Sequence, residues 1–215
     1  MNILILGLGS IGQRHLRNLH SINKNFNFFV LRKKFITPSL NNKNLVVKQD
    51  IKKKYKLKYL KNLSQIKSLS LKIDAAFICT PSKYHVDEAI WLIKNNINVF
   101  VEKPLGSNLK NISSLKNLIL KKKKIVHMMG YQLKFNPIIN KVKEILDKNS
   151  IGQIYNIFIH HGEHINDFHP YEDYRSFYMA SKKQGGGSIL DQCHIMDLSH
   201  HLIGDFSSVL AINTK

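Results

Sequence analysis

The chain has 215 residues, of which 43% are hydrophobic, and it carries a net charge of +19. This length suffices for one substantial core or two small ones, and we find neither a run long enough to cross a bilayer nor a signal-peptide pattern. The two cysteines, Cys79 and Cys193, form no C-x-x-C pair and predict no disulfide framework, so a reducing cytoplasm is the expected location.

The positive charge is concentrated in residues 1–73, where the single acid is Asp50. A nucleic-acid or acidic-membrane surface is one interpretation of such a charge. The cations are scattered, however, with no aromatic ladder and no known nucleic-acid module, so a compositional bias towards Lys, Asn and Ile explains them better. We therefore expect no nucleic-acid partner and no membrane partner, although the positive field would favour an anionic cofactor.

The first predicted element is a buried strand over Asn2–Leu6, followed at once by Gly7, Gly9 and Gly12 in G-x-G-x-x-G spacing. Gly7 permits a tight turn, Gly9 lets a pyrophosphate approach the backbone, and Gly12 lets the next helix pack close to the strand. That helical pattern starts at Ile11, and a helix N-terminus offers unpaired N–H groups to phosphates. The stretch predicts a dinucleotide site, with an ordinary strand–turn–helix as the alternative.

A second strand is predicted over Asn27–Leu31, whose end meets the adenosine ribose in dinucleotide folds. An acid there would accept hydrogen bonds from the 2′-hydroxyl of NAD, whereas this chain has Arg32 followed by Lys33 and Lys34. These cations suit a 2′-phosphate better, so the expected cofactor is NADP or NAD, with NADP favoured. A solvated basic strand end is the simpler alternative.

Strands and helices then alternate along the chain. Strands are expected at residues 45–47, 74–79, Asn98–Val101 and 125–129, and helices at 63–69, after a Ser82 cap, and at 109–120. This alternation predicts an α/β fold with a parallel, doubly wound sheet whose ligand lies at the carboxyl ends of the strands. The residues that fall at such ends are Gly7, Arg32, Thr80 and the Glu102-Lys103-Pro104 turn.

The pattern changes after Gly130. Helices are predicted at residues 138–146 and 188–203, and strands at 154–160 and 208–213. Histidines are frequent between His160 and His201, but neither an H-E-x-x-H motif nor a cysteine pair accompanies them, so no metal is expected.

Several ordered blocks resemble the Gfo/Idh/MocA oxidoreductases, the glucose–fructose oxidoreductase and inositol dehydrogenase group. They are GLGSIG at 7–12, TPSKYH at 80–85, EKPLG at 102–106, GYQLKFNP at 130–137 and GGGSILDQCHIMDL at 185–198. The EKP turn followed by a glycine-rich helix with Asp, His and Asp is more specific than the glycine fingerprint. The segment FHPYEDYR at 168–175 further resembles members that act on sugars in surface-polysaccharide clusters.

The resemblance implies a Rossmann NAD(P)-binding domain over residues 1–127. Over residues 128–215 it implies a partial α+β substrate domain with an open, mainly antiparallel sheet, through which subunits often pair as a homo-oligomer. Relatives continue well past residue 215, so a C-terminally truncated chain, a fragment or an unusually short member is expected.

The resemblance also assigns site residues. The cofactor is expected to contact the glycines and Arg32, together with Ser10, Ile11, Thr80, Pro81, His85, Glu102 and Lys103. Lys103 would lie beside the nicotinamide and the reacting carbon, and Asp191 and His194 would face it from the second domain.

Oxidation of an alcohol carbon requires a hydride acceptor and a base for the hydroxyl proton. His194 is the natural base, Asp191 could hold its tautomer, and Lys103 could orient or polarise the substrate oxygen. Asp191 and His194 are three residues apart, instead of the four of many members, which still places them on one helix face. The plainer readings are a surface lysine for Lys103, a helix histidine bonded to a carboxylate for His194, and a structural role for Asp197.

Tyr174 and Arg175 are predicted substrate contacts, because Arg can bind a carboxylate or phosphate at two points, with a surface ion pair as the alternative for Arg175. Lys134 stands where Arg is frequent in the family, which weakens any bidentate contact there. Cys193 is a poor nucleophile partner for His194, because adjacent helix residues point about 100° apart.

These observations predict an NAD(P)-dependent oxidoreductase that transfers a hydride to or from a secondary hydroxyl or ketone carbon of a sugar, sugar nucleotide or cyclitol. The first alternative is a non-catalytic nucleotide-binding fragment or regulatory protein of the same fold. The second is a basic nucleic-acid binder.

Overall fold

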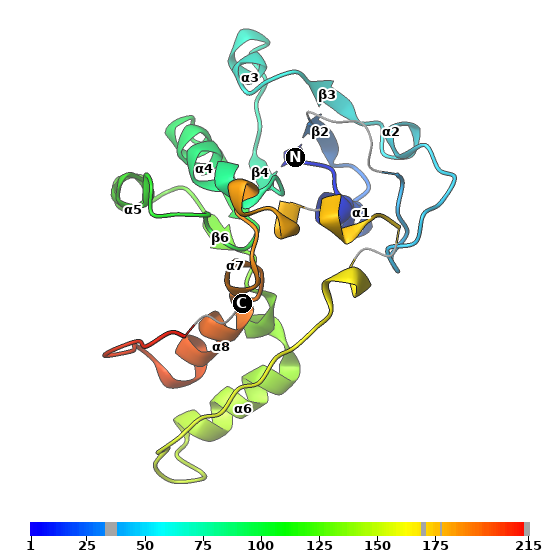
Figure 1. Cartoon of the computed structure of the whole chain (residues 1–215). Helices are drawn as coiled ribbons and strands as arrows, with labels where there is room; N and C mark the ends of the chain where they lie inside the picture. Colours follow the sequence, from blue (N-terminus) through cyan, green and yellow to red (C-terminus); the bar gives the residue numbers. More distant parts are fainter. Residues whose placement is uncertain (33–37, 169–170, 177, 213–215) are drawn as a thin grey trace.

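The computed structural model describes residues 1–32, 38–168, 171–176 and 178–212. Figure 1 shows two lobes, one built on a parallel sheet covered by helices and the other made of helices and extended segments. The stretch that follows the second lobe's first helix returns to the sheet lobe before the chain enters its last helices.

The described residues form one sheet of six parallel strands in the order β3-β2-β1-β4-β5-β6. The strands are β1 (Asn2–Leu6), β2 (Asn27–Leu31), β3 (Lys58–Leu60), β4 (Ala75–Ile78), β5 (Asn98–Val101) and β6 (His127–Met129). The expected parallel, doubly wound sheet is therefore confirmed. The expected strand at 45–47 is wrong: Val46 makes only an isolated bridge to Leu40, and β3 takes the edge position.

Helices cover both faces of the sheet. They are α1 (Ser10–Ile22), α2 (Ile51–Lys54), α3 (Ser64–Ser68), α4 (His85–Lys94) and α5 (Ile112–Lys121), with a 3₁₀ turn η1 (Ser82–Tyr84) before α4. Alternate residues of β1 point to opposite faces, so Ile3 and Ile5 pack with Leu16 of α1. Leu4 and Leu6 pack on the other face, with α4. Both faces of β1 are buried, as a central parallel strand requires.

The turn between β1 and α1 depends on two of its glycines. Gly7 has φ +85°, and a Cβ there would lie 2.5 Å from the backbone oxygen of Cys79. A Cβ on Gly12 would lie 2.2 Å from the backbone oxygen of Gly7. The turn and the close approach of α1 to the strand therefore exclude side chains at both positions.

The second lobe is largely helical. It contains η2 (Gln132–Phe135), α6 (Pro137–Asp147), η3 (Ile165–Asp167), η4 (Tyr174–Ser176), η5 (Tyr178–Ala180), η6 (Lys182–Gln184), α7 (Ser188–Asp191) and α8 (His194–Ile203). The single helix expected at 188–203 is thus divided into α7 and α8. β6 also runs across the domain boundary expected after residue 127.

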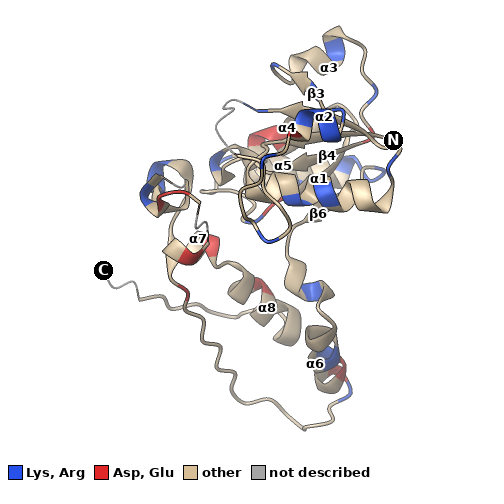
Figure 2. Cartoon of the chain, turned by 90° about the vertical axis from the view of Figure 1, so that its right-hand side faces the viewer, with Lys and Arg blue, Asp and Glu red and all other residues tan. Residues whose placement is uncertain are grey.

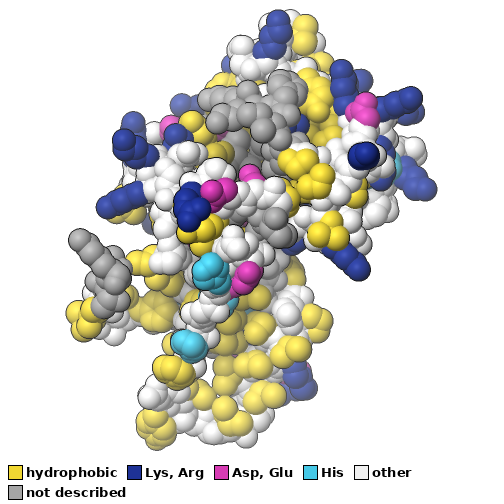
Figure 3. Space-filling view, turned by 45° about the vertical axis from the view of Figure 1, so that its right-hand side comes forward, with side chains coloured by type: hydrophobic (Ala, Val, Ile, Leu, Met, Phe, Trp, Pro, Cys, Tyr) yellow, Lys and Arg dark blue, Asp and Glu magenta, His cyan; other side chains and the backbone are white. Residues whose placement is uncertain are grey.

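The strands expected at 154–160 and 208–213 do not form in the described residues, where both segments are extended and unpaired, and residue 213 lies outside the description. The antiparallel sheet that they would begin is correspondingly missing from the described part of the second lobe. Many apolar side chains of this lobe lie exposed on its surface (Figure 3), and Tyr155 and Phe158 are each 88% exposed. A strand needs a paired neighbour and a face to bury, and these segments have neither.

The stretch between η5 and α7 docks on the sheet lobe. Ser82 was expected to cap α4, but its buried hydroxyl donates instead to the backbone oxygen of Gly185, at 2.9 Å. A Cβ on Gly185 would lie 2.2 Å from that hydroxyl, and one on Gly186 would lie 2.2 Å from the backbone oxygen of Met179. The glycines therefore allow a contact that joins the two lobes.

Lys and Arg residues are spread over several elements of the sheet lobe (Figure 2). This spread agrees with the scattered charge of the sequence. Within the described residues, we find no helix with the length and apolar character needed to cross a membrane.

We expect Gly12→Ala to lower the free energy of unfolding by about 3 kcal/mol, because the new methyl group meets backbone that cannot move aside. Gly9→Ala is the matched control: a Cβ there meets nothing within 4 Å. We expect it to cost less than about 1 kcal/mol as a poorer helix cap. Urea unfolding followed by circular dichroism measures both, and equal losses would contradict the packing role of Gly12.

Candidate active site

A cavity of about 600 Å³ lies at the carboxyl ends of the strands. The sheet lobe contributes Ser10 and Ile11 from the start of α1, Thr80 after β4, and Glu102 and Lys103 after β5. The second lobe contributes Asp191 and His194. Residues predicted from separate blocks of the sequence thus share one hollow.

The N-terminus of α1 borders this cavity. No side chain caps the helix, and its first turn holds no acidic residue. The three glycines do not line the cavity, but a Cβ on Gly9 would meet nothing within 4 Å, which leaves open space beside the helix N-terminus. Uncapped N–H groups facing open space are suited to an anionic group.

Lys103 links the two lobes. Its Nζ donates to the backbone oxygen of Asp191 at 2.7 Å and to Asp191 Oδ1 at 2.8 Å. The Lys103 side chain is 20% exposed and that of Asp191 is 11% exposed. Charges so withdrawn from water need close pairing, and here the pair fixes the position of the ammonium group.

His194 begins α8, just beyond this ion pair. Its Nδ1 is buried and has no hydrogen-bond partner in the described residues. Burial, followed by the positive charge of Lys103, lowers the pKa of His194. The expectation that Asp191 fixes the tautomer of His194 is wrong, because the Asp191 carboxylate bonds to Lys103 and Gln192 instead.

Asp197 was weighed as a carboxylate partner of His194, but it pairs with Lys134 instead. Its Oδ1 lies 2.8 Å from Lys134 Nζ, and its side chain is 10% exposed. Lys134 also lies over the ring of Tyr131, so the position where Arg is frequent in the family holds a cation that joins α8 to η2.

The loop after β4 is held by internal hydrogen bonds. The hydroxyl of Thr80 donates to Glu88 at 2.6 Å. The buried ring of His85 lies between the backbone oxygens of Thr80, at 2.6 Å, and Pro104, at 2.8 Å, and burial lowers its pKa. His85 therefore ties the loop after β4 to the loop after β5. Pro81 lies before η1 and does not line the cavity.

Arg32 lies outside the main cavity. It lines a second hollow of about 530 Å³ at the end of β2, together with Asp50, Lys52 and Tyr59. Lys33 and Lys34 lie outside the described residues. The strand ends therefore open into two hollows, where the sequence predicted one crevice.

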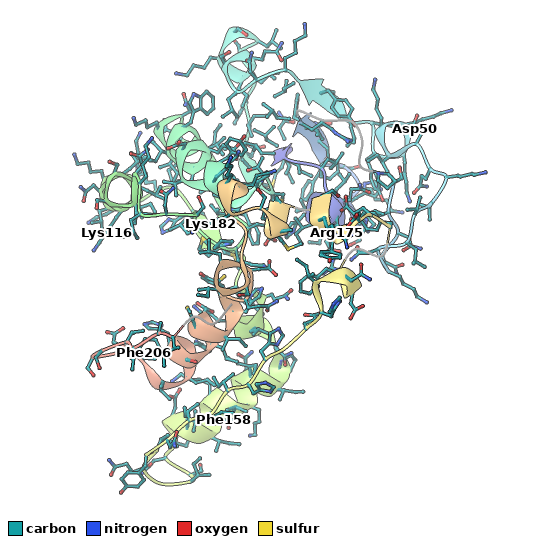
Figure 4. The ribbon with its side chains drawn as sticks, in the orientation of Figure 1. Asp50, Lys116, Phe158, Arg175, Lys182 and Phe206 are labelled. Carbon is teal, nitrogen blue, oxygen red and sulfur yellow. The ribbon has the colours of Figure 1, made fainter. Side chains whose placement is uncertain are left out.

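Tyr174 and Arg175 do not line the cavity either. Arg175 stacks on the ring of Tyr174 at 4.8 Å and pairs with Asp173 at 3.4 Å, with its own side chain 73% exposed. Figure 4 labels Arg175, which belongs to η4. The ion pair weighed for Arg175 is thus the one found, with Asp173.

Three tyrosines at or near the site were not among the site residues predicted from the sequence. Tyr131 and Tyr178 line the cavity, and burial raises the pKa of both hydroxyl groups. The Tyr171 side chain hydrogen-bonds to Ser10 at the start of α1. Tyr131 stands inside the GYQLKFNP block and Tyr171 inside the FHPYEDYR block, which were the available signals, whereas nothing local marks Tyr178.

The histidine-rich segment gathers no metal site within the described residues, where no three His, Cys, Asp or Glu side chains lie close enough to hold an ion. Cys193 hydrogen-bonds to Tyr131, and burial raises the pKa of its thiol.

The strand order and the glycine turn define the class of dinucleotide-binding Rossmann folds. Residues 1–131 match the family described as "Oxidoreductase family, NAD-binding Rossmann fold", and residues 139–215 match the "GFO/IDH/MocA C-terminal domain". The chain therefore belongs to the Gfo/Idh/MocA oxidoreductase family.

Characterised relatives agree with this membership. The chain is 25% identical to levoglucosan dehydrogenase of Pseudarthrobacter phenanthrenivorans over 137 aligned residues, and this alignment covers 63% of this chain and 34% of that protein. It is 26% identical to myo-inositol 2-dehydrogenase of Thermotoga maritima over 153 aligned residues, and this alignment covers 71% of this chain and 42% of that protein. The chain thus spans less than half the length of these relatives.

Solved structures share the fold. Myo-inositol 2-dehydrogenase of Lactobacillus plantarum superposes with a TM-score of 0.72 at 23% identity, covering 95% of this chain and 56% of that one. Scyllo-inositol dehydrogenase of Lactobacillus casei, solved with NAD(H) and scyllo-inositol, gives 0.71 at 21% identity with the same coverage.

We expect Lys103→Met to raise the pKa of His194, because it removes the positive charge that disfavours the imidazolium. The pKa should stay below that of a free histidine, since burial is the larger cause. NMR titration of the His194 ring measures it. Lys83→Met, whose ammonium group lies over Tyr84, is the control and should leave the midpoint unchanged; an unmoved midpoint in Lys103→Met would refute the coupling.

Proposed function

We propose that this protein is an NAD(P)-dependent oxidoreductase that transfers a hydride to or from a secondary hydroxyl or ketone carbon of a sugar, sugar nucleotide or cyclitol. One observation carries the proposal: Lys103, Asp191 and His194 line the same cavity as the uncapped N-terminus of α1. The levoglucosan and inositol dehydrogenases among the relatives support the class of substrate.

The residues around the glycine turn fit a dinucleotide. The open space beside Gly9 and the N–H groups of Ser10 and Ile11 would receive the pyrophosphate. Thr80, Glu102 and Lys103 would border the nicotinamide half. When bound, the nicotinamide supplies the group that accepts or donates the hydride.

Lys103 is proposed to bind and polarise the substrate oxygen. An ammonium group has three N–H donors, and Asp191 accepts from it at two points. The remaining donor is available to a hydroxyl or ketone oxygen in the cavity. Because Asp191 anchors the ammonium group, that donor has a defined position before substrate arrives.

His194 is proposed as the general base. Its lowered pKa keeps the imidazole neutral at pH 7, which is the form that accepts a proton. The buried, unpartnered Nδ1 is consistent with a neutral ring. In the reverse direction, the same ring would return the proton to the substrate oxygen.

We also propose a preference for NADP. Arg32 and Lys52 line the hollow at the end of β2, where the adenosine ribose of a dinucleotide lies, and both are suited to a 2′-phosphate. Asp50 lines the same hollow, but its carboxylate accepts from the N–H of Lys53 as the cap of α2.

We retain the division into a cofactor-binding unit over residues 1–127 and a substrate-binding unit over 128–215 as a proposal. It is supported by the position of the buried core, since every buried apolar side chain of the described residues lies at or before Leu115. The strand-like segments at 154–160 and 208–212 would join an open sheet once neighbouring strands pair with them.

Fluorescence titration with NADPH and NADH tests the cofactor proposal. We expect saturable binding of both, with NADPH tighter, and we expect Arg32→Asp to weaken NADPH relative to NADH at least about tenfold through loss of a charge-assisted hydrogen bond. Lys24→Asp makes the same charge change beyond the end of α1 and should leave the ratio unchanged. No saturable binding of either cofactor would count against the proposed function.

Turnover with a panel of sugars, sugar nucleotides and cyclitols tests the chemistry. With an accepted substrate, Lys103→Met and His194→Phe should each lower kcat about 100-fold or more. His200→Phe, on the same helix and paired with Asp205, is the matched control and should retain activity. Cofactor binding without turnover of any compound would favour a non-catalytic nucleotide-binding protein, the alternative suggested by the partial coverage of the relatives.

A further inference from the structure

His15 of α1 reaches across to the loop that carries Lys103. Its Nε2 lies 2.7 Å from Glu102 Oε1, and the two side chains are 17% and 12% exposed. Because a carboxylate can only accept, Nε2 carries the proton and donates it. The ring packs against Phe77 and Phe100, with centroids 5.3 and 4.9 Å away, so aromatic neighbours fix its plane.

The second oxygen of the Glu102 carboxylate faces Lys103. Glu102 Oε2 accepts from the backbone N–H of Lys103 at 3.2 Å. On another side the carboxylate lies against Gly130, just after β6, where an added Cβ would be only 3.1 Å from the same oxygen. The Glu102 carboxylate is thus held by His15 of α1 and by the backbone N–H of the residue that follows it.

We propose that His15 is a positioning residue: it orients the Glu102 carboxylate, which fixes the backbone of Lys103 and so aims its ammonium group at Asp191 across the cavity. Because the Lys103 side chain is long, a small rotation of its backbone moves Nζ by a larger distance. If Glu102 lost its hydrogen bond from His15, the Lys103 backbone could rotate and Nζ would move away from Asp191. The inference deepens the proposed function, on which its kinetic consequence rests.

This reading changes the role expected for Glu102. Both carboxylate oxygens are engaged by the protein itself, on His15 and on the Lys103 N–H. The main role of Glu102 is therefore to hold the backbone of the EKP turn in place. Contact with the cofactor, which was expected from the sequence, is its lesser role.

Two substitutions separate the hydrogen bond from the packing. His15→Phe keeps an aromatic ring against Phe77 and Phe100 but removes the donor. His15→Gln keeps an N–H at the corresponding distance along the side chain but removes the ring. His20→Phe is the matched control on the same helix, because His20 packs on Tyr55, at 5.0 Å, and away from Glu102.

Amide hydrogen exchange by NMR on the cofactor-free protein tests the positioning directly. We expect the Lys103 amide to exchange about tenfold faster in His15→Phe, since its acceptor is no longer held. His15→Gln should recover most of the protection, and His20→Phe should match the unchanged protein. Equal protection of Lys103 in all four proteins, or equal loss in His15→Phe and His20→Phe, would overturn the inference whatever the protein binds.

The kinetic arm uses the substrate found for the proposed function. His15→Phe should lower kcat about tenfold with little change in cofactor affinity, because a misplaced ammonium group costs orientation and not binding. Its effect should be lost in the background of Glu102→Gln, where the carboxylate that it orients is already gone. Additive effects of the two substitutions would overturn the relay through Glu102, and the exchange experiment still stands if no substrate is turned over.

Discussion

Two hydrogen bonds from one ammonium group hold the candidate site together. The donor, Lys103, follows β5, and the acceptors are the backbone and carboxylate oxygens of Asp191 at the end of α7. Both side chains are mostly withdrawn from water, so each charge has lost much of its hydration. Such a pair adds little net stability, yet loss of either partner leaves the other unpaired. Its main effect is therefore geometric: it sets where a cation stands in the cavity.

The ion pair can form only because the stretch before α7 docks closely on the sheet lobe. The hydroxyl of Ser82 donates to Gly185, and neither Gly185 nor Gly186 has room for a Cβ. A bulkier residue at either position would move α7 away and take Asp191 with it. The glycine-rich block thus matters here for contact between lobes, whereas the glycines at the start of the chain matter for a turn and for open space.

Local patterns predicted the sheet lobe well. The strands β1, β2 and β5 have the expected bounds because a continuous apolar run bounded by a turn encodes a buried parallel strand. The edge strand β3 was missed because its Lys58 and Tyr59 lack such a run, and the pairing of Tyr59 with Val30 depends on the neighbour. The segments at 154–160 and 208–212 show the opposite case: they have a strand-like pattern but no described strand lies beside them to pair with.

Contacts between distant residues were the part that the sequence could not supply. The sequence put Lys103, Asp191 and His194 at one site, but the contact expected between Asp191 and His194 is replaced by one between Asp191 and Lys103. A continuous helix would have kept Asp191 and His194 together on one face. In the structure the helix is broken between α7 and α8, and the Asp191 carboxylate bonds to Lys103, whereas Nδ1 of His194 has no hydrogen-bond partner in the described residues. Burial and the ammonium group of Lys103 lower the pKa of His194, so the electrostatics of the site also depend on contacts between residues far apart in the sequence.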